Sequence, residues 1–87
     1  MADVAIKQIP SPSAEQYKMA RVGLDLTVRD LAEIANVNKA TIVRIEAGLN
    51  VRETTAQTIR QKLEEKGARF LTDESDKEIL VSIPKSE

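Results

Sequence analysis

Two closely spaced helix-start signals in the middle of the chain constrain its fold most strongly. Thr27 and Asp30 have the spacing of a capping box, in which each side chain hydrogen-bonds a backbone amide that the helix leaves unpaired. A few residues later, Asn38 is a favourable N-cap for another helix. Between these signals lies Asn36, a residue type that tolerates the left-handed backbone conformation of a tight turn. The pattern therefore predicts two short helices joined by a three-residue turn.

The apolar residues of this segment agree with that prediction. The two helices are expected over about 28–35 and 39–47. Helices that cross at a steep angle need a small residue where they meet, and Ala32 occupies that position. The residues expected to face inward are Leu31, Ala35, Val37, Ile42 and Ile45. Together these features define a helix-turn-helix motif over 28–47, whose second helix is able to enter the major groove of DNA.

Similar signals predict one further helix on each side of the motif. Ser13 and Gln16 have capping-box spacing before a helix expected over roughly 14–24. Thr54 and Gln57 have the same spacing, so a fourth helix is expected to begin around Thr54. Glycines are expected to help the chain leave three of the four helices: Gly23, Gly48 and Gly67.

Alternating apolar residues predict strands at both ends of the chain. Residues 69–72 and 79–83 flank the polar turn DESDK and are typical of a β-hairpin closed by Pro84. In the N-terminal arm, Val4 and Ile6 alternate with other residues, which indicates a further short strand. A hairpin alone is only marginally stable. We therefore expect these strands to pack on the helices or to pair across the two-fold axis of a dimer.

The chain is expected to form one small, mainly α domain. Its 87 residues suit a single domain, and 41% hydrophobic residues are too many for a disordered chain. The expected parts are an N-terminal arm at 1–12, a helix-turn-helix domain at 13–67 and a β-hairpin at 68–87 that is a candidate dimerisation element.

The residue types that are missing exclude several kinds of function. The chain has no Cys and no His, which rules out a zinc finger, a disulfide framework and thiol or imidazole catalysis. Carboxylate pairs such as Asp30 with Glu33 lack an accompanying nucleophile and base, so no catalytic residues, metal or cofactor are expected. Apolar runs are too short to span a membrane or to form a signal peptide. We expect a cytoplasmic protein that has no membrane partner.

Positive charge is concentrated near the predicted motif, although the total charge is close to neutral. The chain has 13 Lys and Arg against 14 Asp and Glu. Residues 37–52 carry Lys39, Arg44 and Arg52 against Glu46 alone, whereas the C-terminal segment is acidic. The local excess is a modest electrostatic footprint for nucleic acid.

The stretch TVRDLAEIANVNKATIVRIEAG resembles the helix-turn-helix of the Cro/repressor-type (XRE) family of prokaryotic and phage regulators. The resemblance covers roughly residues 14–72. It rests on the small residue at the helix crossing, the apolar positions, the I-x-x-I-E-x-G ending and the preceding helix. It implies a four-helix, lambda-repressor-like domain that binds double-stranded operator DNA as a homodimer, on a pseudo-palindrome, and acts as a repressor of transcription.

The resemblance also implies roles for residues of the motif. Its second helix would be the recognition helix, with these residues facing the bases: Lys39, Ala40, Val43 and Arg44. Arg44 is able to pair with guanine O6 and N7, whereas Ala40 and Val43 are limited to thymine methyl groups. Phosphate contacts are expected from Arg29, Asn38, Thr41 and Arg52, with Asn38 and Thr41 as alternative helix-capping residues.

A second interpretation is a protein-interaction module, such as an antitoxin-like or adaptor protein, in which the helices serve as a scaffold. Val28 favours it, because the family often has a phosphate-contacting Gln at that position. The acidic C-terminal segment would then bind a basic protein partner. In either interpretation, Glu46 is expected to be structural and to pair with a nearby Arg. The two functions are compatible, since autoregulating antitoxins bind both DNA and protein.

Overall fold

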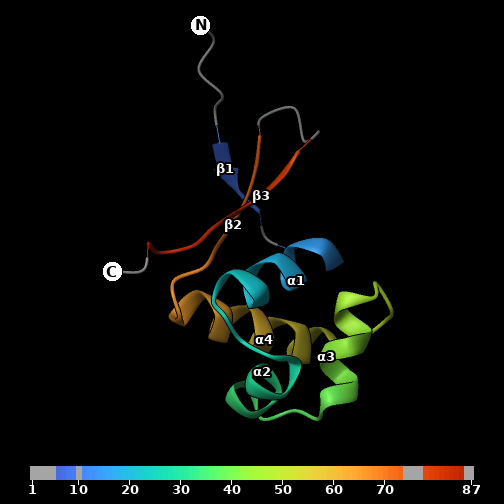
Figure 1. The fold of residues 1–87 in the computed structure, drawn as a ribbon. Helices are drawn as coiled ribbons and strands as arrows, with labels where there is room; N and C mark the ends of the chain where they lie inside the picture. The colour runs from blue at the N-terminus through green and yellow to red at the C-terminus, as the bar shows by residue number, and fades with distance from the viewer. Residues whose placement is uncertain (1–5, 10, 74–77, 86–87) are drawn as a thin grey trace, which may run out of the picture.

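Four helices and a three-stranded sheet make up the part of the chain that the computed structural model describes (Figure 1). The described residues are 6–9, 11–73 and 78–85. In chain order the elements are β1 (Ile6–Gln8), α1 (Ala14–Gly23), α2 (Val28–Ala35), α3 (Lys39–Glu46), α4 (Glu53–Glu65), β2 (Arg69–Asp73) and β3 (Ile79–Ser82). The helices gather into one bundle and the sheet lies beside α1. The expected mainly α, lambda-repressor-like fold with a C-terminal hairpin is confirmed.

The first two capping boxes form as the sequence predicts. At α1, the Ser13 amide donates to Gln16 Oε1 (3.0 Å) and the Gln16 amide donates to Ser13 Oγ (3.3 Å). At α2, the corresponding bonds between Thr27 and Asp30 are both 2.9 Å long. Each box pairs two backbone amides that the helix cannot satisfy internally. These local bonds set where both helices begin.

The capping of α4 differs from the prediction, although the helix begins close to the expected position. The helix begins at Glu53, with Arg52 as the N-cap residue, and no side chain of the described residues caps it. The predicted capping box of Thr54 and Gln57 is therefore wrong. Val51, just before the helix, packs against the hydrophobic core. Thr54 lies inside the helix, and a residue already inside a helix no longer acts as its cap.

Gly23 has a different role from the one expected at the end of α1. It is the last helical residue, and the positive φ of the turn belongs to Asp25, at 61°. A Cβ atom on Gly23 would lie 2.8 Å from Cγ1 of Ile83. Glycine at this position therefore allows the segment after β3 to pack closely against α1. The expected glycine stops do have positive φ at Gly48 (78°) and Gly67 (109°).

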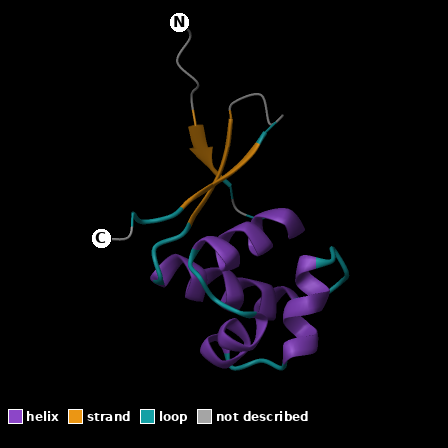
Figure 2. Cartoon of the chain, in the orientation of Figure 1, coloured by secondary structure: helices purple, strands orange, loops and turns teal. Residues whose placement is uncertain are grey.

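The sheet is antiparallel, with β2 between β1 and β3 (Figure 2). Lys7 of β1 pairs with Thr72, and Leu71 pairs with Leu80 of β3. The expected N-terminal strand is thus present and joins the hairpin of its own chain. Val4 and residues 74–77 of the predicted polar turn lie outside the described residues.

A single hydrophobic core connects the helices with the sheet. The buried apolar residues are Tyr17, Ala20, Leu31, Ala32, Ala35, Ile42, Ile45, Ile59, Leu63, Ala68 and Phe70. The ring centroids of Tyr17 on α1 and Phe70 on β2 are 5.8 Å apart, so the sheet contributes directly to this core. The small residue expected at the helix crossing, Ala32, is 3% exposed.

Two buried or half-buried polar side chains attach the strands to the helices. Gln16 is completely buried, and its Nε2 donates to the carbonyl oxygens of Leu71 and Leu80, each at 2.9 Å. On α4, Arg60 Nη2 donates to the carbonyl oxygen of Ile9, at 3.0 Å, just after β1. Because a buried side-chain amide requires acceptors, Gln16 is satisfied only when the sheet packs on α1, and these bonds make the sheet part of the helical domain.

Candidate nucleic-acid interface

Local hydrogen bonds hold the turn between α2 and α3 in one conformation. Asn36 has a φ of 58°, and the Val37 amide donates to the carbonyl oxygen of Ala32 at 2.9 Å. Asn38 Oδ1 accepts from both the amide and the hydroxyl of Thr41, at 2.9 Å each. The predicted left-handed turn and the predicted cap of α3 are both confirmed. The start of α3 is consequently held in place by the turn itself.

α3 has one buried face and one open face. Ile42 and Ile45 are buried in the core, as predicted. The four residues expected to face the bases are all exposed: Lys39, Ala40, Val43 and Arg44. Val43 is 55% exposed, although it is a large apolar residue. The structure thus places all four on the accessible surface of α3, which lies at the edge of the helix bundle (Figure 1).

The side chain of Arg44 has a partner that the sequence did not predict. Its Nη2 donates to the carbonyl oxygen of Asn50, at 2.8 Å, in the loop between α3 and α4. Arg44 therefore stabilises this loop and still has further N–H donors, because a guanidinium carries five of them. Arg44 and Asn50 line an open hollow of about 570 Å³ together with Asn38, Thr41 and Arg52.

The residues expected to contact phosphate fall into two groups. Asn38, Thr41 and Arg52 border the hollow, and the first two also fill the helix-capping role that was their alternative assignment. Arg29 lies apart from the hollow, on α2, where its Nε is 3.7 Å from Glu33 Oε2 in a highly exposed ion pair. Phosphate binding by these residues stays a prediction. Half-buried Val28 packs against the core, which gives it a structural use in place of a polar contact.

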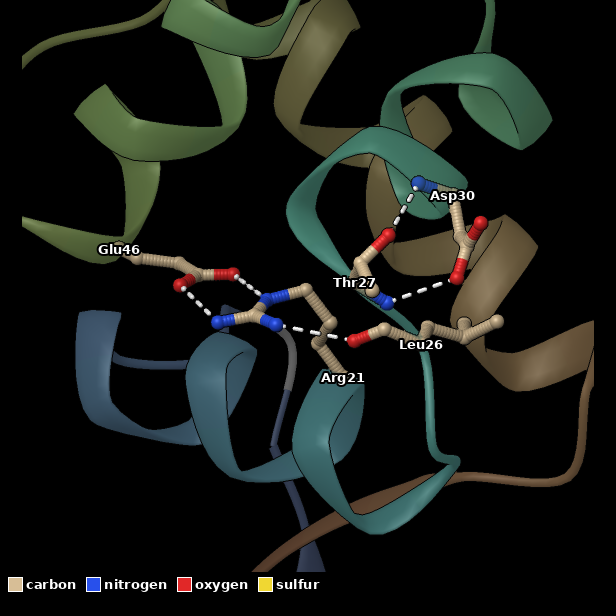
Figure 3. Close-up of polar contacts among 5 residues, drawn as sticks. All are labelled: Arg21, Leu26, Thr27, Asp30 and Glu46. Carbon is tan, nitrogen blue, oxygen red and sulfur yellow. Dashed lines mark hydrogen bonds and ion pairs between the residues drawn. The ribbon is translucent and has the colours of Figure 1, made fainter.

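An ion pair between α1 and α3 holds the C-terminal end of α3 (Figure 3). Arg21 Nε and Nη2 donate to the two carboxylate oxygens of Glu46, at 2.7 and 3.1 Å. Arg21 Nη1 also donates to the carbonyl oxygen of Leu26, at 2.9 Å. The expectation that Glu46 is structural and pairs with an Arg is confirmed. Arg21 itself was not identified from the sequence, because 25 positions separate it from Glu46.

The pKa values of Asp30 and Tyr17 are shifted, and each shift has a structural cause. The backbone amide of Thr27, followed by its hydroxyl, stabilises the Asp30 carboxylate and lowers its pKa. Burial raises the pKa of Tyr17, whose hydroxyl donates to the Ala56 carbonyl oxygen at 3.4 Å. In the described part of the chain, no group of three acidic side chains has the geometry to hold a metal ion.

None of the described helices is long and apolar enough to cross a membrane.

Comparison with known protein families agrees with this geometry. The family described as helix-turn-helix matches residues 18–67, which run from within α1 to the end of α4. No curated protein and no solved structure gives a significant match. The matched family is a DNA-binding regulatory domain and not a catalytic one. The chain belongs to the Cro/repressor-type (XRE) helix-turn-helix family of DNA-binding regulators.

Proposed function

We propose that this protein is a cytoplasmic transcriptional repressor that binds a pseudo-palindromic operator as a homodimer. The observation that carries the proposal is the open face of α3. Its outward residues are exposed, while Asn38 caps one end of the helix and the Arg21–Glu46 pair holds the other. A helix supported in this way enters a major groove with little conformational entropy to lose.

The proposed contacts divide between base reading and backbone binding. Arg44 and Lys39 donate hydrogen bonds to base edges. Ala40 and Val43 contact thymine methyl groups. Arg29 and Arg52, together with the polar groups around the hollow, bind phosphates and determine the register of α3 on the DNA. Two copies would place their recognition helices about 34 Å apart, one turn of B-DNA. Occupation of the operator would then block transcription.

Selection from randomised double-stranded oligonucleotides, at two salt concentrations, tests this function. We expect an enriched inverted repeat whose affinity falls as salt rises, because phosphate contacts release counterions. Arg44→Ala should weaken binding of the selected sequence by about tenfold or more, since a good base contact contributes about 1–3 kcal/mol. Lys66→Ala is the matched control: it removes an exposed positive charge at the far end of α4 and should leave the selected sequence unchanged.

A protein-interaction module is the second candidate, and the packing of Val28 favours it, since no polar anchor occupies that position. Under this alternative, folded protein enriches no DNA sequence, and Lys39→Ala with Arg44→Ala has no effect on function in cells. An enriched sequence that these substitutions abolish would support the repressor instead.

A further inference from the structure

Arg44 is attached to the loop between α3 and α4 at two points. Its backbone carbonyl oxygen accepts from the Leu49 amide, at 3.0 Å, and its Nη2 donates to the carbonyl oxygen of Asn50, at 2.8 Å. The first bond belongs to the end of the helix, whereas the second joins a side chain on the exposed face of α3 to the loop. The orientation of the Arg44 guanidinium therefore depends on the conformation of the loop.

The loop is held at both of its ends. Gly48 has a φ of 78°, and its amide donates to the carbonyl oxygen of Ile45, at 3.3 Å. Together with the bond from the Leu49 amide, this is the Schellman arrangement, which ends a helix and satisfies its last carbonyl groups. Beyond Asn50, Val51 packs against the hydrophobic core. The Asn50 carbonyl group lies between these two fixed points, so it is a firmly held acceptor.

Lys39, the other cation of α3, has no such anchor. Its side chain is exposed and forms no hydrogen bond or ion pair within the described part of the chain. A free lysine side chain loses rotamer freedom when it binds, and its point charge imposes little direction on the partner. An arginine that is already held loses less freedom and presents a planar fork. Arg44 and Lys39 should thus differ in how strictly they select a base.

The remaining donors of Arg44 are sufficient for pairing with guanine. A guanidinium carries five N–H donors, and the bond to Asn50 uses one of them. Guanine presents two neighbouring acceptors in the major groove, O6 and N7, and an arginine fork pairs with both. An arginine that is fixed on one side while it pairs with a base on another has few orientations left. It therefore favours one base at one position.

We propose that the Asn50 carbonyl group positions Arg44 for base reading, so that the α3–α4 loop determines how strictly the protein selects one guanine in each half-site. The inference rests on the proposed function and adds a positioning residue to it. Asn50 acts through Arg44, without a base contact of its own. The guanine opposite Arg44 should be strictly specified, whereas the base opposite Lys39 should be only weakly specified.

NMR of the side-chain nitrogens in the free, full-length protein tests the positioning without DNA. A guanidinium that is held on one side rotates slowly about its Nε–Cζ bond, so Arg44 should give separate signals for its two Nη nitrogens. Arg29 is the matched control, because its side chain is 76% exposed and its Nε lies 3.7 Å from Glu33. Its Nη signals should average into one. An averaged signal for Arg44 as well would overturn the inference.

The selected DNA sequences test the difference between the two cations. One guanine in each half-site should be nearly invariant, and its preference should be lost in Arg44→Ala. The position whose preference changes in Lys39→Ala should accept more than one base. Replacing the invariant guanine with 7-deazaguanine removes only N7, and wild-type affinity should then fall about tenfold because one of two paired acceptors is lost. A position read by Lys39 that is as strict as the one read by Arg44 would overturn the inference.

Two substitutions at Gly48 separate the loop geometry from the presence of Arg44. The nearest non-neighbouring atom to an added Cβ would be Ala14 Cβ, at 3.8 Å, so space is not limiting. Gly48→Val forces a β-branched residue into a positive φ and should shift the loop, whereas Gly48→Asn suits that conformation. The loss of affinity on 7-deazaguanine replacement should shrink to about threefold or less in Gly48→Val and stay about tenfold in Gly48→Asn. An undiminished loss in Gly48→Val would overturn the inference.

Failure of this inference is distinguishable from failure of the proposed function. A folded wild-type protein that selects no DNA refutes both the repressor and base reading by Arg44. A protein that selects an inverted repeat, yet reads its guanine equally well in Gly48→Val, remains a repressor and refutes only the positioning by the loop. Circular dichroism shows whether Gly48→Val is folded. If it is not, the NMR comparison of Arg44 with Arg29 still decides the inference.

Discussion

Arg21 on α1 and Glu46 at the end of α3 form a two-point ion pair whose side chains are only 12% and 9% exposed (Figure 3). The pair connects the helix that carries the sheet with the helix that presents the candidate DNA-binding face. Its third bond, to the Leu26 carbonyl oxygen, also includes the loop before α2. One guanidinium group therefore links three segments of the helical domain.

Glu46→Ala should lower the free energy of unfolding by about 3 kcal/mol. The reason is that the nearly buried guanidinium of Arg21 loses its carboxylate partner. Urea unfolding followed by circular dichroism measures the change. Glu33→Ala is the control, since it breaks the highly exposed pair with Arg29 and should cost about 0.5 kcal/mol or less. Equal losses in the two variants would show that the Arg21–Glu46 pair contributes no more than a surface pair.

Gln16→Ala should loosen the sheet from the helices. The substitution removes two buried hydrogen bonds, from Gln16 Nε2 to the carbonyl oxygens of Leu71 and Leu80, and should lower stability by about 2 kcal/mol. Relative to the wild-type protein, amide hydrogen exchange should become faster in β2 and β3 while its rate in α2 changes little. Gln61→Ala, at an exposed position of α4, should change neither stability nor exchange. Uniformly faster exchange in all elements would argue against a specific attachment of the sheet.

Asp30 should make stability depend on pH in the acidic range. Its hydrogen bonds from Thr27 lower the folded-state pKa of the carboxyl below the unfolded-state value. The stabilisation is therefore complete above the unfolded-state pKa and is lost as pH falls through the folded-state pKa. Thermal melts of the wild-type protein and Asp30→Asn, compared across pH, should converge at acidic pH. A difference in melting temperature that persists at low pH would contradict a role for the ionised carboxylate.

Val43 should read thymine if the protein is a DNA-binding repressor. Replacing thymine with uracil in the half-site removes only the methyl group, which is the part of the base that the exposed apolar side chain of Val43 would contact. Affinity should fall about three- to fivefold at the contacted position, consistent with about 0.8 kcal/mol per buried methylene-sized group. Val43→Ala should reduce the difference between the two DNAs, whereas Lys39→Ala should weaken both equally. Equal wild-type affinity for thymine and uracil DNA would exclude this contact.

Local patterns in the chain were sufficient to predict most of the helical domain. The capping boxes at Ser13 and Thr27, the cap at Asn38 and the left-handed turn at Asn36 depend on residues within a few positions of one another. The apolar spacing of the helices predicted which faces are buried. At α4 the predicted start around Thr54 is close to the observed Glu53, but the predicted capping box is wrong because Thr54 already lies inside the helix.

The sequence by itself therefore determined where the first three helices begin, which turn joins α2 to α3 and which family the motif resembles, since nearest-neighbour chemistry controls these features. Tertiary packing determined the long-range hydrogen-bond and ion-pair partners of the buried and half-buried side chains. Gln16 meets carbonyl groups 55 and 64 residues away, and Arg21 meets a carboxylate 25 residues away. Arg44 donates to the carbonyl oxygen of Asn50, and the missing Cβ of Gly23 allows Ile83 to pack closely against α1. Such contacts arise only when folding brings distant elements together, because no local pattern encodes the distance between them.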